Sequence, residues 1–301
     1  MKLFNKSKLF LIFFFLCNLA SAKEIEGCSP NNAYVVFEEK NLNILLEKNA
    51  NDIIYPASLV KLMTLYLTFE SLEKKNISLN TEIKISARGE EISKVNKVNT
   101  LNLRQGYTIT VREAIYSVIV RSFNEAAVAL AEIVGKDEWQ FVNMMNRKAQ
   151  ELGMYRTSFS NSSGLHEISQ YTTALDLARL AIAIKKDFPD YYHLFSLKFY
   201  KFNHKKYETH NHILEEYQGS EGLKTGFTFA SGFNLIAAAK KSNVRVISVL
   251  IGCSSASKRE QFTKILLNKA FKKIPHEIYP EISGKIRKTF SYSDNNIDTL
   301  Y

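Results

Sequence analysis

A serine and a lysine stand three residues apart in YPASLVKLMT, the stretch that spans residues 55–64. Residues at i and i+3 share one face of a helix, so a helix that opens near Pro56 lets the Lys61 amine reach the Ser58 hydroxyl. The positive end of the helix dipole disfavours the protonated lysine, which favours Lys61 as a base and Ser58 as a nucleophile. A capping serine beside a solvated lysine is the alternative interpretation, because Ser-x-x-Lys alone is a weak signal.

The same spacing occurs twice more in this lysine-rich chain, at Ser71/Lys74 and at Ser255/Lys258. Ser71 lies in a charged helix end and Ser255 lies at the start of a predicted helix, so both pairs indicate ordinary structural residues. The Ser58 pair differs because a proline precedes it and an apolar helix follows it.

Two further stretches carry groups suited to such chemistry. SFNE, residues 122–125, offers a second hydroxyl near a side-chain amide, but it also matches a capping box that would occupy the Ser122 hydroxyl. EGLKTG, residues 221–226, puts a lysine, a hydroxyl and a glycine before a predicted strand. An anion can lie against a glycine backbone because no Cβ is in the way, although a turn with a surface lysine has the same composition.

Hydrophobic periodicity indicates which elements hold these residues. Strands are predicted at 33–37 and 42–46 as a hairpin, at 81–86, and at 234–240 and 244–252 as a second hairpin. Helices are predicted from Pro56, at 110–120 behind a Thr110–Glu113 capping box, at 122–135, at 137–153, from about Thr173, and at 257–271. This order predicts an α+β fold, in which the N- and C-terminal strands form one antiparallel sheet flanked by helices, with an inserted, mainly helical lobe.

Taken in order, the Ser-x-x-Lys pair, the Ser-x-Asn stretch and the Lys-Thr-Gly stretch form the motif triple of penicillin-binding proteins and class A β-lactamases. The chain resembles the low-molecular-mass D-alanyl-D-alanine carboxypeptidases, serine peptidases of the penicillin-recognising fold. The resemblance runs over roughly residues 31–271 and includes VREAIYSVIVRSFNEAAVALAE and EGLKTGFTFASGFNLIAAAKKSNVRVISVLIG. It implies a β-lactamase/DD-peptidase-like fold that uses no cofactor and no metal.

The resemblance also implies a catalytic role for each motif residue. Ser58 would attack the carbonyl between two D-alanines of a peptidoglycan stem peptide, and Lys61 would take its proton. Ser122 would pass a proton towards the leaving amine, and Asn124 would bind the substrate amide and Lys61. The same acyl-enzyme chemistry implies that β-lactam antibiotics are covalent inhibitors.

Five further positions are implied to bind substrate. Lys224 and Thr225 would hold the terminal carboxylate, and Gly226 would let the substrate lie along the strand edge. The nucleophile's own N–H and that of Phe227 would form the oxyanion hole, which fits the charge that develops in acyl transfer. Arg259 resembles a family arginine near the carboxylate pocket.

The chain departs from the family at two aromatic positions and at its end. Phe123 stands where relatives usually carry a glycine, so we expect a bulky ring there to narrow the cleft or to change which stem peptide fits. Phe227 replaces a frequently polar residue. Only about 30 residues follow the last predicted helix, and they show no clear amphipathic anchor, so we expect no C-terminal membrane anchor.

Other functions stay open as alternatives. A DD-endopeptidase would cut a cross-link with the same residues, and a serine β-lactamase would need a glutamate to position water, for which Glu167 is the nearby candidate. An inactive relative would only bind peptidoglycan. A Ser-His-Asp hydrolase lacks its Gly-x-Ser-x-Gly elbow here. We expect His204, His210 and His212 to be solvated rather than to hold a metal.

Residues 1–22 have the pattern of a signal peptide, with a basic start, an apolar run and the small-residue site Ala20-Ser21-Ala22. The apolar run is short for a membrane span, so we expect cleavage near Ala22 and export to the periplasm or cell envelope rather than a retained anchor. The catalytic domain is then expected at 23–272, followed by a polar tail at 273–301 that is partly disordered.

Charge and cysteine content add two expectations. The formal net charge of +10 suits a protein that works near anionic envelope polymers, and no basic stripe interleaved with aromatics indicates nucleic acid. Cys28 and Cys253 are permitted to form a disulfide in an exported chain if the first and last predicted strands are neighbours. The sequence leaves that pairing open.

Overall fold

The computed structural model of the chain describes residues 28–95 and 100–274. The expected signal peptide, residues 1–22, and nearly all of the expected tail, residues 273–301, lie outside the described residues. Among the helices that are described, none has the length and apolar character needed to span a membrane.

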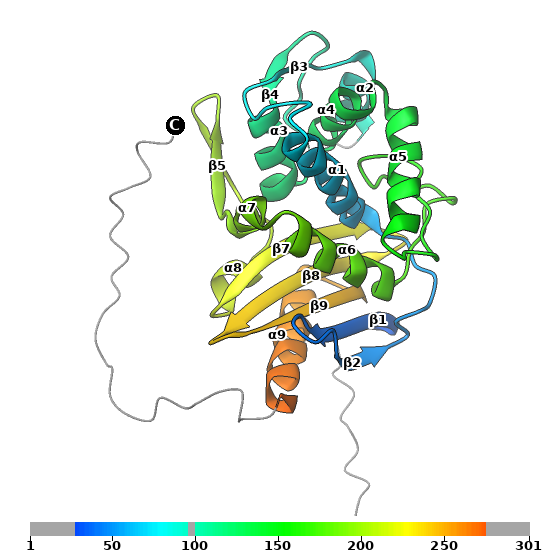
Figure 1. Ribbon diagram of the computed structural model, residues 1–301, viewed down its shortest axis with the longest axis vertical. Helices are drawn as coiled ribbons and strands as arrows, with labels where there is room; N and C mark the ends of the chain where they lie inside the picture. Colours follow the sequence, from blue (N-terminus) through cyan, green and yellow to red (C-terminus); the bar gives the residue numbers. More distant parts are fainter. Residues whose placement is uncertain (1–27, 96–99, 275–301) are drawn as a thin grey trace, which may run out of the picture.

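A five-stranded antiparallel sheet combines strands from both ends of the chain (Figure 1). Its order is β2-β1-β9-β8-β7. The strands are β1 (Cys28–Glu38), β2 (Ile44–Lys48), β7 (Ser220–Thr228), β8 (Gly232–Lys241) and β9 (Val244–Cys253). The prediction that the terminal strands share one sheet is therefore confirmed, and β7 is left as an edge strand with one described neighbour.

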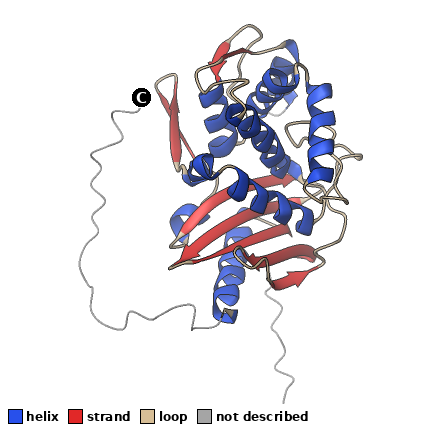
Figure 2. Ribbon diagram, in the orientation of Figure 1, coloured by secondary structure: helices blue, strands red, loops and turns tan. Residues whose placement is uncertain are grey.

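The central strands are apolar on both faces because helices cover both sides of the sheet (Figure 2). Along β8, Ile236 and Ala238 join the core under the helical lobe, whereas Leu235 and Ala237 join the core under α9 (Ala256–Lys273). This alternation follows from the two-residue period of a strand.

The helical lobe is inserted between β2 and β7, as the sequence predicts. It contains α1 (Lys61–Glu73), α2 (Ala87–Val95), α3 (Val111–Tyr116), α4 (Asn124–Gly135) and α5 (Glu138–Glu151), with the small ribbon β3 (Glu82–Lys84) and β4 (Thr108–Thr110). The chain then returns to the sheet through α6 (Ala174–Asp187), α7 (Pro189–Tyr192), the hairpin β5 (Phe199–Phe202) and β6 (Lys205–Glu208), and α8 (Ile213–Glu216).

Side-chain caps stabilise the starts of α3, α6 and α9. Thr110 and Glu113 form a reciprocal capping box at the start of α3. The Thr173 side chain accepts a bond from the Asp176 N–H at the start of α6. Ser255 likewise caps α9 by accepting from the Lys258 N–H at 3.2 Å, which confirms that this Ser-x-x-Lys pair is structural.

One predicted helix ends differently from the prediction. The helix expected over 110–120 runs as α3 only to Tyr116 and continues as a π-helical turn over Ser117–Arg121. Such turns insert an extra residue into the helical repeat and are frequent at functional sites. The turn ends at Ser122 in the left-handed conformation, with φ of 61°.

The two cysteines that the sequence left open are joined. Cys28 and Cys253 are partners in the register between β1 and β9, and they form a disulfide. The bond links the first described residue to the last residue of the sheet.

Candidate active site

Ser58 and Lys61 lie together at the start of α1. Ser58 belongs to a 3-10 turn, Ala57–Val60, and Lys61 is the first residue of α1, with its Nζ 3.0 Å from the Ser58 Oγ. Side chains at i and i+3 eclipse one another in a 3-10 turn, which brings the two groups closer than an α-helix would. Ala57 has a φ of 50°, a region that a residue with a Cβ rarely occupies, so the backbone is held in a strained form just before the serine.

Lys61 has two acceptors besides the serine. Its Nζ donates to the Asn124 Oδ1 at 2.8 Å and to the backbone carbonyl of Ser163. An ammonium has three donors, and these three oxygens satisfy all of them. A neutral amine keeps two donors for Asn124 and Ser163 and points its lone pair at Ser58, so the contact with the serine can reverse and accept the hydroxyl proton.

The surroundings favour the neutral amine. Lys61 is fully buried, and this burial, followed by the nearby positive charge of Lys224, lowers the pKa of Lys61 well below its usual value. The Glu125 carboxylate acts in the opposite direction. A buried amine with a lowered pKa beside a hydroxyl is the arrangement expected of a base and its nucleophile.

Ser122 and Lys224 form a second pair across the site. The Lys224 Nζ donates to the Ser122 Oγ at 2.9 Å and to the Thr225 carbonyl at 2.9 Å. Burial, and then the charge of Arg259, lowers the pKa of Lys224 to about 7. The left-handed turn at Ser122 directs its hydroxyl to β7, so this serine caps no helix, and the capping-box interpretation is wrong.

Glu125, the other half of that expected capping box, binds elsewhere. Its Oε1 accepts from the Thr100 hydroxyl at 2.6 Å and from the Leu101 N–H at 2.5 Å. Helix α4 begins at Asn124 with no side-chain cap on Phe123. Burial raises the pKa of Glu125, although its hydrogen bonds oppose that rise. Glu125 thus ties the segment at residues 100–101 to the start of α4.

The Lys-Thr-Gly stretch lies on β7 directly beside the nucleophile. A Cβ built on Gly226 would lie 3.3 Å from the Ser58 N, closer than most Cβ contacts, which explains why a glycine suits this position. The Phe227 side chain is exposed, and no strand among the described residues pairs with the edge of β7 that faces away from β8, the kind of edge to which an extended ligand can add.

Arg259 and His210 lie next to Lys224, and the positive charges of Arg259 and Lys224 make this end of the site cationic. Arg259, in the first turn of α9, is buried, pairs with Glu260 and donates to the His210 carbonyl at 3.4 Å. His210 was expected to be solvated, which is wrong: it is partly buried, and burial together with Arg121 and Lys224 lowers its pKa to about 4. His204 and His212 are exposed, and no described cluster of His, Cys, Asp or Glu could hold a metal.

A loop over residues 161–170 closes the site next to the nucleophile. Gly164 has a φ of 79°, and a Cβ built there would lie 2.1 Å from the Ala57 carbonyl oxygen, so the loop packs tightly on the turn before Ser58. The Asn161 side chain accepts from the Gly164 N–H at 2.7 Å, and the Gln170 amide donates to the Leu165 carbonyl at 2.8 Å. These bonds hold the Ser163 carbonyl against Lys61.

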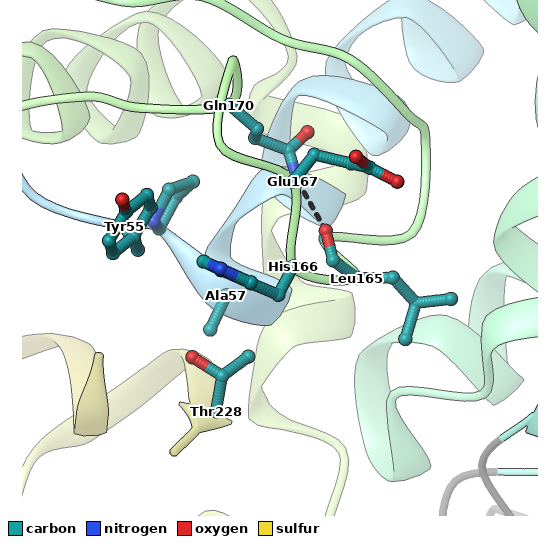
Figure 3. A pocket seen from close by; sticks show the side chains of 9 residues that line it. Tyr55, Ala57, Leu165, His166, Glu167, Gln170 and Thr228 are labelled. Carbon is teal, nitrogen blue, oxygen red and sulfur yellow. Dashed lines mark hydrogen bonds between the residues drawn. The ribbon is translucent and has the colours of Figure 1, made fainter. Parts of the chain in front are cut away.

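The same loop forms one wall of a small open pocket (Figure 3). The rings of Tyr55 and His166 meet edge to face with centroids 4.7 Å apart. Ala57 and Thr228 line the pocket below them. Glu167 also lines it, but its carboxylate is directed away from both rings, so no contact supports it as a water-positioning residue.

Phe123 does not stand free in the cleft. Its ring is buried and packs edge to face on Tyr207 of β6, with centroids 5.6 Å apart. The expectation that this ring narrows the cleft is therefore wrong, because the β5–β6 hairpin covers it.

The structure thus brings all the predicted site residues into one region and adds three that sequence reasoning missed. These are Glu125, His210 and the Ser163 carbonyl. A backbone carbonyl carries no side-chain signal, and His210 lies in a polar stretch that resembles a solvated connector. The capping-box pattern does mark Glu125 in the sequence, but it predicts Ser122 as the partner, whereas Glu125 binds Thr100 and Leu101.

Comparison with known proteins identifies relatives over most of the chain. A family model for peptidase family S11, described as D-alanyl-D-alanine carboxypeptidase, matches residues 20–255. D-alanyl-D-alanine carboxypeptidase DacF of Bacillus subtilis is 34% identical over 77% of this chain and 60% of its own length. D-alanyl-D-alanine endopeptidase of Haemophilus influenzae is 29% identical over 89% of this chain and 91% of its own length.

A solved structure gives the same result for the fold. Penicillin-binding protein 5 from Haemophilus influenzae superimposes with a TM-score of 0.77 at 33% identity, over 80% of this chain and 70% of that one. The chain spans only 60% of the length of the Bacillus subtilis carboxypeptidase.

Proposed function

Because the chain belongs to the D-alanyl-D-alanine carboxypeptidase family, peptidase family S11, we propose that it is a penicillin-sensitive serine carboxypeptidase. It removes the terminal D-alanine from peptidoglycan stem peptides through an acyl-enzyme on Ser58. The observation that carries this proposal is the 3.0 Å contact between the Ser58 hydroxyl and the buried Lys61 amine.

Acylation begins with proton transfer from Ser58 to Lys61. The Ser58 Oγ forms a bond to the carbonyl carbon between the two D-alanines while its proton passes to the neutral amine. The N–H groups of Ser58 and Phe227 donate to the oxygen on which negative charge develops. The close approach of Gly226 to the Ser58 N supports this placement, because Gly226 directly precedes Phe227 and so brings the two N–H groups near each other.

The leaving amine needs a proton as the carbon–nitrogen bond breaks. Ser122 can donate its hydroxyl proton to that nitrogen and recover one from Lys224, which lies 2.9 Å away. A pKa of about 7 lets Lys224 give up a proton near neutral pH. Water then attacks the ester carbon and gives up a proton, which passes through Ser122 to Lys224 and restores its ammonium. Lys61 returns the proton that it took from Ser58 to the departing Oγ, and the shortened peptide leaves.

The positive charge of the site would favour substrates that end in a free carboxylate. Lys224 and the Thr225 hydroxyl would bind it directly, while Arg259 contributes positive charge from behind Lys224. Asn124, already bound to Lys61 through its oxygen, has an amide NH₂ with which to bind the substrate backbone.

A DD-endopeptidase is the second candidate, because the endopeptidase relative is matched over 91% of its length. A serine β-lactamase and an inactive binding protein are less well supported. For the first, the candidate Glu167 directs its carboxylate away from the Tyr55 and His166 rings, and the second would not need the two buried lysine–serine pairs.

We place the enzyme outside the cytoplasm, in the periplasm or cell envelope, after signal-peptide cleavage near Ala22. The disulfide between Cys28 and Cys253 supports export, since disulfides persist in oxidising compartments.

Two substrates test the proposal and separate its two candidates. A soluble stem pentapeptide ending in D-Ala-D-Ala should release D-alanine with the wild type and not with Ser58→Ala, measured by chromatography. A cross-linked peptide dimer should be cut much more slowly. If only the dimer is cut, the endopeptidase assignment replaces the carboxypeptidase one, and if neither is cut by folded protein, the proposal fails.

A further inference from the structure

The carboxylate of Glu138 binds the loop that closes the site. Glu138 is the first residue of α5, which packs beside α1 in the helical lobe (Figure 1). Its Oε1 accepts from the N–H of Ser162 at 3.0 Å and from the hydroxyl of the same serine at 2.7 Å. Its Oε2 accepts from the Arg88 Nε at 3.0 Å, and only 14% of the side chain is exposed. One carboxylate thus satisfies both donors of a fully buried serine.

Helix α1 binds the same stretch of loop through its carbonyl groups. The Thr64 hydroxyl donates to the Ser162 carbonyl at 2.7 Å, and the Lys61 amine donates to the Ser163 carbonyl. Lys61 and Thr64 are three positions apart on α1 and therefore share one face of the helix. The two loop serines are therefore bound by both helices, by α1 through carbonyl oxygens and by α5 through the N–H and hydroxyl of Ser162.

The position of the Ser163 carbonyl controls where the Lys61 amine points. A neutral amine has two N–H donors and one lone pair, and the acceptors here are the Asn124 Oδ1 and the Ser163 carbonyl. With both donors held, the lone pair is left for the Ser58 hydroxyl. The lysine stem is flexible, so the loss of one acceptor lets the amine turn its lone pair away from the serine proton.

Glu138 can affect the reaction only through this loop. Its hydrogen bonds to described residues go to Ser162 and Arg88, and neither residue is assigned to substrate binding. Without the carboxylate, the buried N–H and hydroxyl of Ser162 lose their acceptor. An unpaired buried donor is costly, so the loop would shift to reach another acceptor or water, and the Ser163 carbonyl would move with it.

We propose that Glu138 is a positioning residue for acylation, which holds the loop so that the Ser163 carbonyl orients the Lys61 amine. The proposal rests on the proposed function, because it takes Lys61 as the base that activates the nucleophile. It adds a residue that touches neither the substrate nor the reacting atoms and that acts on the rate of the chemical step.

The role requires an oxygen atom of Glu138 and not its charge. A single oxygen, Oε1, accepts both hydrogen bonds from Ser162, and the amide oxygen of a glutamine can accept the same two. The charge serves the ion pair with Arg88, which lies on α2. Arg88 is 43% exposed and also pairs with Glu91 at 2.9 Å, so it can turn away from a neutral side chain at position 138.

The two steps of acylation by benzylpenicillin separate this role from substrate binding. Rapid quenching and intact-protein mass spectrometry over a range of drug concentrations give the dissociation constant of the non-covalent complex and the first-order rate constant of acylation. We expect Glu138→Ala to lower the rate constant about tenfold to a hundredfold, as a displacement of about 1 Å at the reacting groups does. The dissociation constant should stay unchanged.

Glu138→Gln is the conservative variant, and it should restore most of the rate constant that Glu138→Ala loses. Glu70→Ala is the matched control. Glu70 of α1 pairs with Lys148 of α5 at 2.9 Å and is 24% exposed, so its loss removes an ion pair between the same two helices without touching the loop. Both constants should stay unchanged in this control. Thermal unfolding of each variant verifies that it is folded.

Thr64→Val tests the loop with Glu138 intact, and it decides the question if Glu138→Ala does not fold. Valine has nearly the shape of threonine but cannot donate to the Ser162 carbonyl. We expect this variant also to lower the acylation rate constant and to leave the dissociation constant unchanged. An unchanged rate constant in folded Thr64→Val would overturn the role of the loop.

Three results with the Glu138 variants overturn the proposal. Equal rate constants in Glu138→Ala and the wild type would show that the loop keeps its position without this residue. A loss in Glu138→Gln as large as that in Glu138→Ala would assign the effect to charge. A weaker non-covalent complex with an unchanged rate constant would assign Glu138 to drug binding. Wild-type protein that forms no adduct would instead contradict the proposed function, which is a separate result.

Discussion

The Nζ of Lys224 lies 2.9 Å from the Oγ of Ser122, so a lysine from the sheet holds a serine from the helical lobe. The contact joins residues 102 positions apart and crosses the boundary between the two layers. It makes the second serine of the site dependent on the protonation of a lysine whose pKa is lowered by burial and by Arg259.

That dependence predicts an alkaline limb in the pH profile. In the proposed mechanism, protonated Lys224 binds the carboxylate of the substrate, and the pKa of Lys224 is about 7. Because kcat/KM reports the free enzyme, it should fall as pH rises through about this value. Lys224→Arg keeps the charge at all accessible pH values, so its remaining activity should lack this limb. A limb that persists in the arginine variant would assign the titration to another group.

Glu125 is expected to influence the pH below which kcat/KM falls on the acidic side, because it acts on the pKa of Lys61. The negative charge of Glu125 raises the pKa of Lys61, and in the proposed mechanism Lys61 must be neutral to accept the Ser58 proton. Glu125→Gln removes that charge, so the pKa of Lys61 falls further and the acidic limb should move to lower pH. Thr100→Val is the control, because it removes one hydrogen bond to Glu125 and retains the charge. An equal shift in both variants would point to a displaced loop instead of a lost charge.

Two glycines with positive φ, Gly164 and Gly106, allow the effect of tight packing on stability to be separated from that of backbone strain. An alanine Cβ at Gly164 would lie 2.1 Å from the Ala57 carbonyl oxygen, whereas Gly106 has a similar φ of 84° with nothing within 4 Å. Gly106→Ala should cost about 1–2 kcal/mol of unfolding free energy through backbone strain alone. Gly164→Ala should cost clearly more and should also slow acylation, since the loop carries the Ser163 carbonyl that binds Lys61. Urea unfolding and acylation rates check both; equal effects of the two variants would contradict the packing argument.

The disulfide is expected to stabilise the fold without taking part in catalysis. Cys28 and Cys253 close a loop with a sequence separation of 225. The double variant Cys28→Ser/Cys253→Ser should lose about 2–4 kcal/mol of unfolding free energy, measured by urea titration. Its acylation rate by benzylpenicillin should match the wild type below the unfolding transition. A large loss of acylation in the folded variant would mean that the bond positions the site.

The sequence predicts those features that follow from periodicity and motif spacing. The alternating strands at both chain ends predict the shared sheet, and the spacing of Ser58 and Lys61 predicts the contact between them. The α+β fold and the family resemblance are both confirmed.

The features that the sequence did not predict depend on tertiary contacts, which local sequence patterns do not encode. The π-helical turn at Ser117–Arg121 turns Ser122 away from its expected role as a cap. Phe123 has an exposed-cleft position in the sequence motif but is covered by Tyr207, which lies more than 80 residues later. The lowered pKa of His210 likewise depends on its burial and on the charges of Arg121, Lys224 and Arg259, which lie on other elements.

The most direct test of the central claim is intact-protein mass spectrometry after incubation with benzylpenicillin, followed by peptide mapping. If Ser58 is the nucleophile, one drug molecule becomes covalently attached to Ser58, and folded Ser58→Ala carries no adduct. An adduct that is lost within seconds while free drug is hydrolysed would indicate a β-lactamase instead. An adduct on another residue, or no adduct on folded wild-type protein, would contradict the assignment of Ser58 as the nucleophile.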